Sequence, residues 1–182
     1  MQTFAPRTRQ NNQLGFNLIE AAIVLGIVGL VIGGVFAAWG AVTSQQRVHK
    51  ASDQTTAIVS QIRSAYASRS TFDSTDQDED KFTAALVAAN LIPIEFMSGT
   101  DVKNPWNGKV TVLPDTNGMT IKYTNVNKPD CLKLASAILN NAKTQGLTKV
   151  GATAVTSTSI FTSLPTTICD ASPITFYFTL KN

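Results

Sequence analysis

Few residues of this sequence have the types and spacing that enzyme chemistry needs. His49 is the only histidine, and no Ser/His/Asp, Cys/His or phosphate-loop pattern accompanies it. Glu20 is unusual for another reason, because a carboxylate at the edge of a long apolar segment costs roughly 2 to 3 kcal/mol in a membrane unless it is paired. The sequence therefore predicts no enzyme and no cofactor, and it makes Glu20 the side chain that most needs a partner.

The two cysteines, Cys131 and Cys169, lie far apart in the sequence. Neither has a second cysteine or a histidine cluster near it, so a zinc site would lack ligands. We expect a disulfide bond if this region is exported from the cytosol, and two free thiols are the alternative.

A group of acids follows the first long helical pattern. A calcium loop is one interpretation, but the stretch lacks the central glycine and the terminal bidentate glutamate of an EF-hand. We expect instead a solvated loop whose last acids favour the start of the next helix through its dipole. The acids concerned are Asp73, Asp76, Asp78, Glu79 and Asp80.

An apolar segment near the N-terminus determines the class of protein. Residues 21–42 contain no charge and no proline, and as a helix they span roughly 33 Å, enough for a bilayer core. Arg7 and Arg9 precede this segment and no acid comes before Glu20, which favours a cytoplasmic N-terminus. A cleaved secretory signal is the alternative, with Val35-Phe36-Ala37 as a weak cleavage site.

Small residues recur along this segment at steps of three and four, so they form one stripe on a helix. Such a stripe lets helices approach closely, although membrane helices are in general rich in glycine. We interpret the stripe as a helix-packing face. Its members are Ala22, Gly26, Gly29, Gly33, Ala37 and Gly40.

Beyond residue 42 the helical pattern continues as an amphipathic one, which predicts a single helix of about fifty residues. The expected buried positions are Val48, Ala51, Thr55, Ile58, Ile62 and Ala65. Farther on, we expect a helix over 78–90 with Phe82, Leu86 and Ala89 buried, and a hairpin of strands 109–113 and 119–126. A helix over 129–145 should bury Leu132, Ala135, Leu139 and Ala142, and strands over 150–161 and 174–180 should complete a sheet.

The string Leu14-Gly15-Phe16-Asn17-Leu18-Ile19-Glu20, between a basic leader and a long apolar helix, resembles the processing site of type IV prepilins. The resemblance implies cleavage after Gly15 by a prepilin peptidase, methylation of the new amine at Phe16, and pairing of Glu20 with that amine on a neighbouring subunit. The fifteen-residue leader and the absence of a proline in the helix resemble the type IVb branch. Residues 104–106, Asn-Pro-Trp, also resemble the linker before the sheet in thin-pilus and bundle-forming pilins of that branch.

This resemblance implies an α+β fold, in which a long N-terminal helical spine packs on an antiparallel sheet head with a disulfide-bounded C-terminal region. The expected parts are a leader (1–15), a transmembrane and filament-core half of the spine (16–42), an amphipathic half (43–70) and a globular head (71–182). The implied function is a major pilin of a type IVb pilus for adhesion, aggregation or mating contact. A major pseudopilin of type II secretion, or a minor pilin, is the alternative.

The implied partners are further copies of the chain, the peptidase and N-methyltransferase, an inner-membrane assembly platform, and the membrane itself. The subunit is expected in the inner membrane first and in an extracellular pilus afterwards. Nucleic acid is not expected as a partner, because the net charge is only +3 and two of the basic residues lie in the leader.

Overall fold

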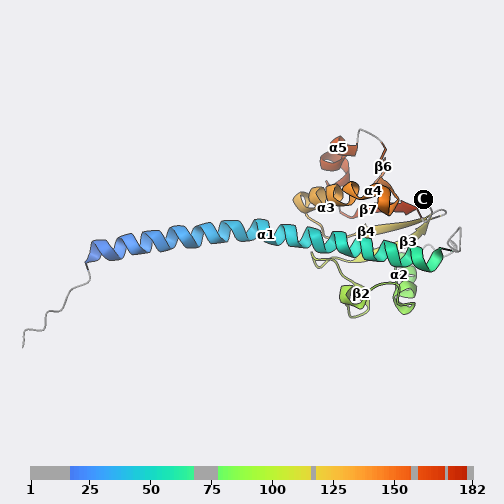
Figure 1. Ribbon diagram of the computed structural model, residues 1–182, viewed down its shortest axis with the longest axis horizontal. Coiled ribbons are helices and arrows are strands. Elements are labelled where there is room, and N and C mark those ends of the chain that lie inside the picture. The colour runs from blue at the N-terminus through green and yellow to red at the C-terminus, as the bar shows by residue number, and fades with distance from the viewer. Residues whose placement is uncertain (1–16, 68–77, 116–117, 157–159, 171, 180–182) are drawn as a thin grey trace, which may run out of the picture. The chain divides into compact units, whose positions relative to one another are not determined.

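The computed structural model describes residues 17–67, 78–115, 118–156, 160–170 and 172–179 (Figure 1). The chain forms two compact units, residues 1–41 and 42–182, and each is described by itself. Helix α1 (Leu18–Tyr66) runs through both and has 49 residues, which confirms the single long helix that the sequence predicts.

The first unit consists of the N-terminal part of α1. The side-chain oxygen of Asn17 accepts a hydrogen bond from the Ile19 backbone N–H at 3.3 Å, as a helix-capping residue does. An 18-residue stretch of α1 is long and apolar enough to cross a membrane, and none of it is buried within the chain. This part of the helix is therefore not stabilised by packing within the described chain.

In the second unit, the C-terminal part of α1 packs on the head. Its buried residues are Val48, Ala51, Gln54, Thr55, Ile58, Val59 and Ile62. Five of the six predicted positions are confirmed, but Ala65 is exposed because it lies in the last turn, beyond the last buried residue of the helix, Ile62. The Thr55 hydroxyl shares a 2.8 Å hydrogen bond with the buried Tyr123 hydroxyl, which ties α1 to the sheet.

The head has one antiparallel five-stranded sheet, in the order β3-β4-β7-β5-β6. Its strands are β3 (Val110–Asp115), β4 (Gly118–Tyr123), β5 (Leu147–Val150), β6 (Thr153–Ala154) and β7 (Ile174–Thr179). The predicted hairpin is β3 and β4, although β4 ends at Tyr123, just before Asn125 takes a positive φ of 60°. Ile174, Phe176 and Phe178 face the core as predicted, and residue 180 lies outside the described residues.

The continuous strand predicted over 150–161 is wrong: only residues 150, 153 and 154 lie in strands, and residues 157–159 lie outside the described residues. Gly151, with a φ of 58°, turns the chain from β5 into the two-residue β6, and residues 160–163 form helix α5 (Ile160–Ser163). Ile160, the first residue of this helix, is buried in the core. The β propensity of a Thr-rich sequence is a weak preference, and here packing of the apolar side chain overrides it.

Helix α2 (Glu79–Ala88) begins at the cap Asp78, whose carboxylate accepts from the N–H groups of residues 80 and 81. Of the three residues predicted to be buried, Leu86 is buried, Phe82 is half-buried and Ala89 is exposed. Thr83, which was not predicted, is buried. The Thr83 hydroxyl accepts from the Val112 N–H at 2.9 Å, so α2 covers the edge strand β3.

Helix α3 (Lys128–Asn140) is followed by the short α4 (Ala142–Gln145), which ends at Gly146 in the left-handed conformation. The predicted buried stripe is partly wrong, because Leu132 and Leu139 are only half-buried. Ala135 and Ala142 are buried as predicted, and the neighbouring residues Cys131 and Ile138 are buried instead of Leu132 and Leu139. The buried face consists of Cys131, Leu134, Ala135 and Ile138, with Ala142 following in α4.

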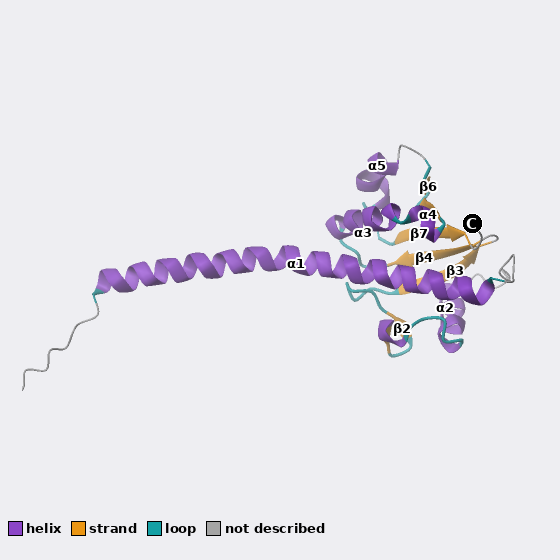
Figure 2. Ribbon diagram, viewed as in Figure 1, coloured by secondary structure: helices purple, strands orange, loops and turns teal. Residues whose placement is uncertain are grey.

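The remaining elements are short: η1 (Ile94–Phe96), the hairpin of β1 (Met97–Ser98) and β2 (Asp101–Val102), and the π-helix η2 (Leu164–Ile168). Within the head, α2 and β2 lie on one side of the α1 segment, and α3, α4 and α5 lie on the other (Figure 2). Buried residues of α1, α2, α3, α5 and the sheet strands belong to one core.

Candidate functional site

The predicted assembly residue, Glu20, lies at the start of α1. Gly15 and Phe16 are outside the described residues, and Glu20 is in the first turn of the helix, exposed to the surroundings. Within the part of the chain that the structure describes, Glu20 forms no ion pair. Its carboxylate is therefore open to a group from outside the described chain.

The apolar side chains around Glu20 are also exposed. Leu18 is 85% exposed, Leu30 78% and Phe36 75%. A continuous apolar surface of this kind is unstable in water, and in a protein it marks contact with lipid or with other subunits. The first half of α1 therefore needs a membrane or further helices around it.

The predicted packing stripe is open along the first half of α1. All six residues of the stripe are exposed: Ala22, Gly26, Gly29, Gly33, Ala37 and Gly40. A Cβ atom added to any of its four glycines would meet no atom of the chain within 4 Å. No contact within the described chain requires glycine here, so any constraint on size must come from a partner.

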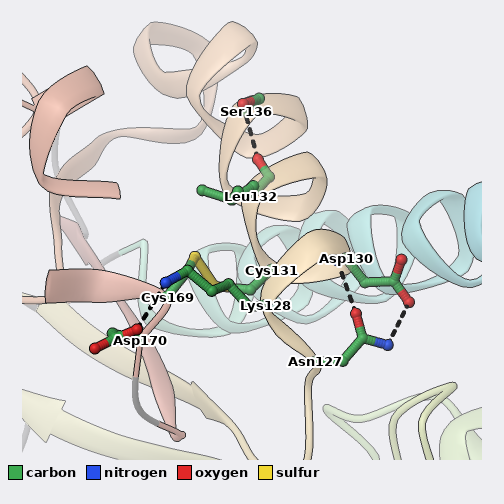
Figure 3. Close-up of a disulfide and its surroundings, with 8 residues drawn as sticks. All are labelled: Asn127, Lys128, Asp130, Cys131, Leu132, Ser136, Cys169 and Asp170. Carbon is green, nitrogen blue, oxygen red and sulfur yellow. Dashed lines mark hydrogen bonds and ion pairs between the residues drawn. A yellow bond between two sulfur atoms is a disulfide. The ribbon is translucent and has the colours of Figure 1, made fainter. Parts of the chain in front are cut away.

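The head contains the predicted disulfide between Cys131 and Cys169 (Figure 3). It joins the first turn of α3 to the residue after η2, across 38 positions of sequence, and the two Cα atoms are 5.7 Å apart. An ion pair between Lys128 and Asp170, with 2.7 Å between Nζ and Oδ1, lies beside it. The C-terminal part of the head is thus fastened to α3 by a covalent bond.

Asp130, next to the disulfide, is a buried carboxylate that the sequence analysis missed. It is 3% exposed and accepts hydrogen bonds from Trp106 Nε1 at 2.7 Å, Asn127 Nδ2 at 3.0 Å and the Ser44 hydroxyl. Lys133 in turn donates to Ser44 at 2.8 Å. One carboxylate therefore joins α1, the segment before β3 and α3. The only sequence signal was Trp106, whose indole N–H needs an acceptor when buried.

These contacts set the charge state of Asp130. Burial raises the pKa of this carboxyl, but the hydrogen bonds from Ser44, Trp106 and Asn127 and the charge of Lys133 outweigh it and hold the pKa below its usual value. The network therefore favours the ionised form in the folded head.

Asp130→Asn is expected to lower the free energy of unfolding of the head by about 2 kcal/mol at neutral pH, because it removes a buried charge that three donors recognise. The pKa is lower in the folded state, so this contribution is full above the ordinary value near 3.8 and is lost as the pH falls through the folded value. Urea unfolding of the full-length chain in detergent at several pH values checks this. For the variant, the free energy of unfolding should fall less steeply than for the wild type as the pH is lowered into the acid range.

Asp170→Asn is the matched control, because this carboxylate is exposed and belongs to a surface ion pair. We expect little change in its urea midpoint. Equal losses for the two variants would contradict a special role for the buried network.

At the other end of the head, Arg63 of α1 clamps the ends of α4 and β7. Its guanidinium donates to the Gln145 carbonyl at 2.5 Å and to the Thr179 carbonyl at 2.7 Å. A Cβ atom on Gly146 would lie 2.1 Å from Arg63 Nη2, so this turn requires glycine for space as well as for its positive φ. The α1 segment is thus bonded to the head at both of its ends.

No group of three or more His, Cys, Asp or Glu side chains is placed to hold a metal ion within residues 17–67, 78–115, 118–156, 160–170 and 172–179. Asp73 and Asp76 of the predicted acidic loop lie outside the described residues. The other three acids form contacts of α2: Asp78 caps it, and Glu79 and Asp80 pair with Lys122 and Lys109.

An apolar helix that is exposed over its first half and carries a disulfide-bonded α+β head over its second half defines a class of helix-anchored subunits. The chain belongs to the family described as PilS N terminal, whose model matches residues 45–181.

The chain is also similar to two known proteins and to one solved structure. The chain is 26% identical over 150 residues to the "Major structural subunit of bundle-forming pilus" of Escherichia coli O127:H6, which covers 79% of this chain and 75% of the relative. A protein with the same description from Escherichia coli O111:H- is 25% identical over 134 residues, covering 70% of this chain and 66% of the relative. A crystal structure of a type IVb pilin from Salmonella typhi has a TM-score of 0.48 and 18% identity, covering 70% of this chain and 97% of that one. The family match and the two relatives confirm the resemblance to type IVb pilins.

Proposed function

We propose that this chain is the major structural subunit of a type IVb pilus, made as a membrane-anchored prepilin and polymerised through α1 into an extracellular filament. One observation carries the proposal: the first half of α1 is apolar, exposed and open to a partner, and it begins with the single acid Glu20. The relatives named as major subunits of bundle-forming pili support the same function. A structural role of this kind requires no catalytic group.

The anchor serves two environments in succession. In the inner membrane, the exposed apolar residues of α1 face lipid tails, and the basic leader stays on the cytoplasmic side. In the filament, the same residues pack against helices of other subunits, and the small-residue stripe allows a close approach. The transfer from lipid to protein keeps the apolar surface out of water throughout.

Glu20 gives this polymer its specificity. Cleavage after Gly15 creates an ammonium group at Phe16, and Asn17 starts the helix directly afterwards. The carboxylate costs energy in the bilayer when it is alone, whereas a neighbour's amine at Phe16 neutralises both charges in the apolar filament core. Only the subunit that sits at the correct axial position brings the two charges together, so the pair sets register.

The first test is the mass of the mature subunit. We expect the chain from sheared filaments to begin at Phe16 with one added methyl group, because the leader, Gly15 and the apolar helix form the pattern that a prepilin peptidase recognises. Intact-mass spectrometry of the subunit, with electron microscopy of the filaments, checks this. A mature chain that retains residues 1–15, or that begins near Ala38, would contradict the proposed processing.

A further inference from the structure

Most charged side chains of the described head have a partner within the chain. Ion pairs join Lys81 with Asp78, Lys103 with Asp101, Lys109 with Asp80 and Asp101, Lys122 with Glu79, and Lys128 with Asp170. Arg63 and Lys133 donate hydrogen bonds, Asp130 accepts them, Asp115 also has a partner, and the Lys149 ammonium lies 5.9 Å from the centre of the Tyr177 ring. Most charged side chains of the described head are therefore paired with groups of the same chain.

Four charged side chains depart from this pattern: Arg47, Lys50, Asp53 and Glu95. Among the charged side chains described between residues 42 and 179, these four have no ion pair, hydrogen bond or aromatic-ring contact within the described chain. All four line the same cavity of about 710 Å³ between the α1 segment 43–54 and the segment 95–105, which we name the charged groove. Unpaired charges of both signs thus collect at one place on the head.

Two further features of the charged groove point to a missing partner. Gln54, which lines it, is 1% exposed and donates from Nε2 to the Lys103 carbonyl at 2.9 Å, while its Oε1 receives no hydrogen bond from the described part of the chain. A buried acceptor without a donor is uncommon and costs free energy. Beside the groove, Ile94, the neighbour of the lining residue Glu95, is 88% exposed; among the described residues, the other large apolar side chains with strong exposure lie on α1 between residues 18 and 42.

We propose that the charged groove is the docking surface for the head of a second copy of this chain, an inference that rests on the proposed pilus function. Two cations and two acids side by side do not suit a partner of one charge sign, such as a nucleic acid or an anionic membrane. They suit a protein surface with both signs. The head of another copy offers such a surface, for example the exposed Lys128 and Asp170 pair.

The position of the charged groove in the chain favours a second copy over an unrelated protein. Arg47 follows Val42 by only five residues, so at most about 18 Å of chain separates it from the apolar segment. Once neighbouring copies pack through that segment, their heads are brought within reach of the groove. Ion pairs formed there would fix the orientation of one head on the next more than they would add affinity.

A photo-cross-linking residue at position 94 of the full-length chain tests the occupant. In sheared filaments, illumination should join a substantial fraction of subunits into species of twice the subunit mass. The same probe in the Glu20→Ala chain, which we expect not to polymerise, should give no such species. Products with a protein of another mass would overturn the proposal, as would filaments of normal number without cross-linked dimers.

Charge reversal tests the side chains. Arg47→Glu together with Lys50→Glu should reduce the filaments recovered by shearing at least about tenfold, because the two cations that would pair with acids of the second copy's head become acids that repel them. Lys149→Glu, a single charge reversal outside the groove, is the control and should leave the yield unchanged, whereas each single reversal within the groove should lower it. Non-reducing gels report whether the disulfide, and hence the folded head, forms. Equal yields for a folded double variant and the wild type would overturn the proposal.

These results separate the inference from the proposed function. If wild-type cells make filaments that contain this chain while position 94 gives no dimers, the groove proposal fails and the pilus function stands. If the filaments do not contain this chain at all, the pilus function fails.

Discussion

Replacing both Cys131 and Cys169 by alanine is expected to lower the free energy of unfolding of the head by about 4 kcal/mol. The bond closes a loop across 38 positions, and in the chain-entropy model a loop of this length restricts the unfolded chain by roughly that amount. Both sulfurs are buried in the folded head, so the cavity left by the smaller side chains adds a further loss. Urea unfolding of the full-length chain in detergent measures the shift.

Membrane insertion should be unchanged in the same variant, because the cysteines belong to the unit formed by residues 42–182 and the apolar segment belongs to the other. The amount of subunit in the membrane fraction, together with its sensitivity to added protease, separates the two effects. A double variant with the wild-type urea midpoint would show that the bond is not a major source of stability. Reduction of the wild type should give a similar loss, which serves as the chemical control.

The predictions that succeeded depend on strong local patterns. The long helix follows from an apolar segment without proline that continues into an amphipathic repeat, and both periods match an α-helix. The hairpin of β3 and β4 follows from alternation around a turn sequence. The alternation in β7 places Ile174, Phe176 and Phe178 on one face, as a strand beside a core requires.

The predictions that failed depend on contacts between distant residues. The sequence predicts one helix over 129–145, but the structure breaks it at Asn141, and the buried face of α3 includes Cys131, which is bonded to Cys169. The strand expected over 150–161 is interrupted by the turn at Gly151, and its last two residues belong to α5, where Ile160 is buried. Asp130 receives donors from residues 44 and 106, which only the tertiary fold brings together.

The candidate site shows the same division. Glu20, the small-residue stripe and the two cysteines can be predicted from residue type and spacing alone; the structure confirms the disulfide, and the roles of Glu20 and the stripe stay predictions. The sequence does not identify the charged groove, because that groove is recognised by four charged side chains that have no partner within the described chain. Arg47, Lys50 and Asp53 look like an ordinary solvated helix face in the sequence. They become informative only when other charged side chains of the described head are found to have partners.

Glu20→Ala is expected to abolish pili while leaving the prepilin processed and anchored in the inner membrane. The change removes a carboxylate that costs roughly 2 to 3 kcal/mol at the edge of the bilayer, so insertion should be at least as efficient as in the wild type. In the filament, however, the neighbouring Phe16 amine would be left as an unpaired charge in an apolar core, which is strongly destabilising. Electron microscopy of the cells and the subunit mass in the membrane fraction check both parts.

Glu20→Gln separates charge from shape. Glutamine retains the size of the side chain and a carbonyl oxygen that can accept a hydrogen bond from the Phe16 amine, but it cannot neutralise that amine. If the ion pair sets the axial position of each subunit, Glu20→Gln cells should lack pili, as Glu20→Ala cells do. The ammonium group of each incoming subunit then has no opposite charge beside it in a medium of low dielectric constant. Pili of normal number and length in Glu20→Gln cells would show that charge pairing is not the mechanism. Glu20 would then act through hydrogen bonding or through recognition by the assembly platform.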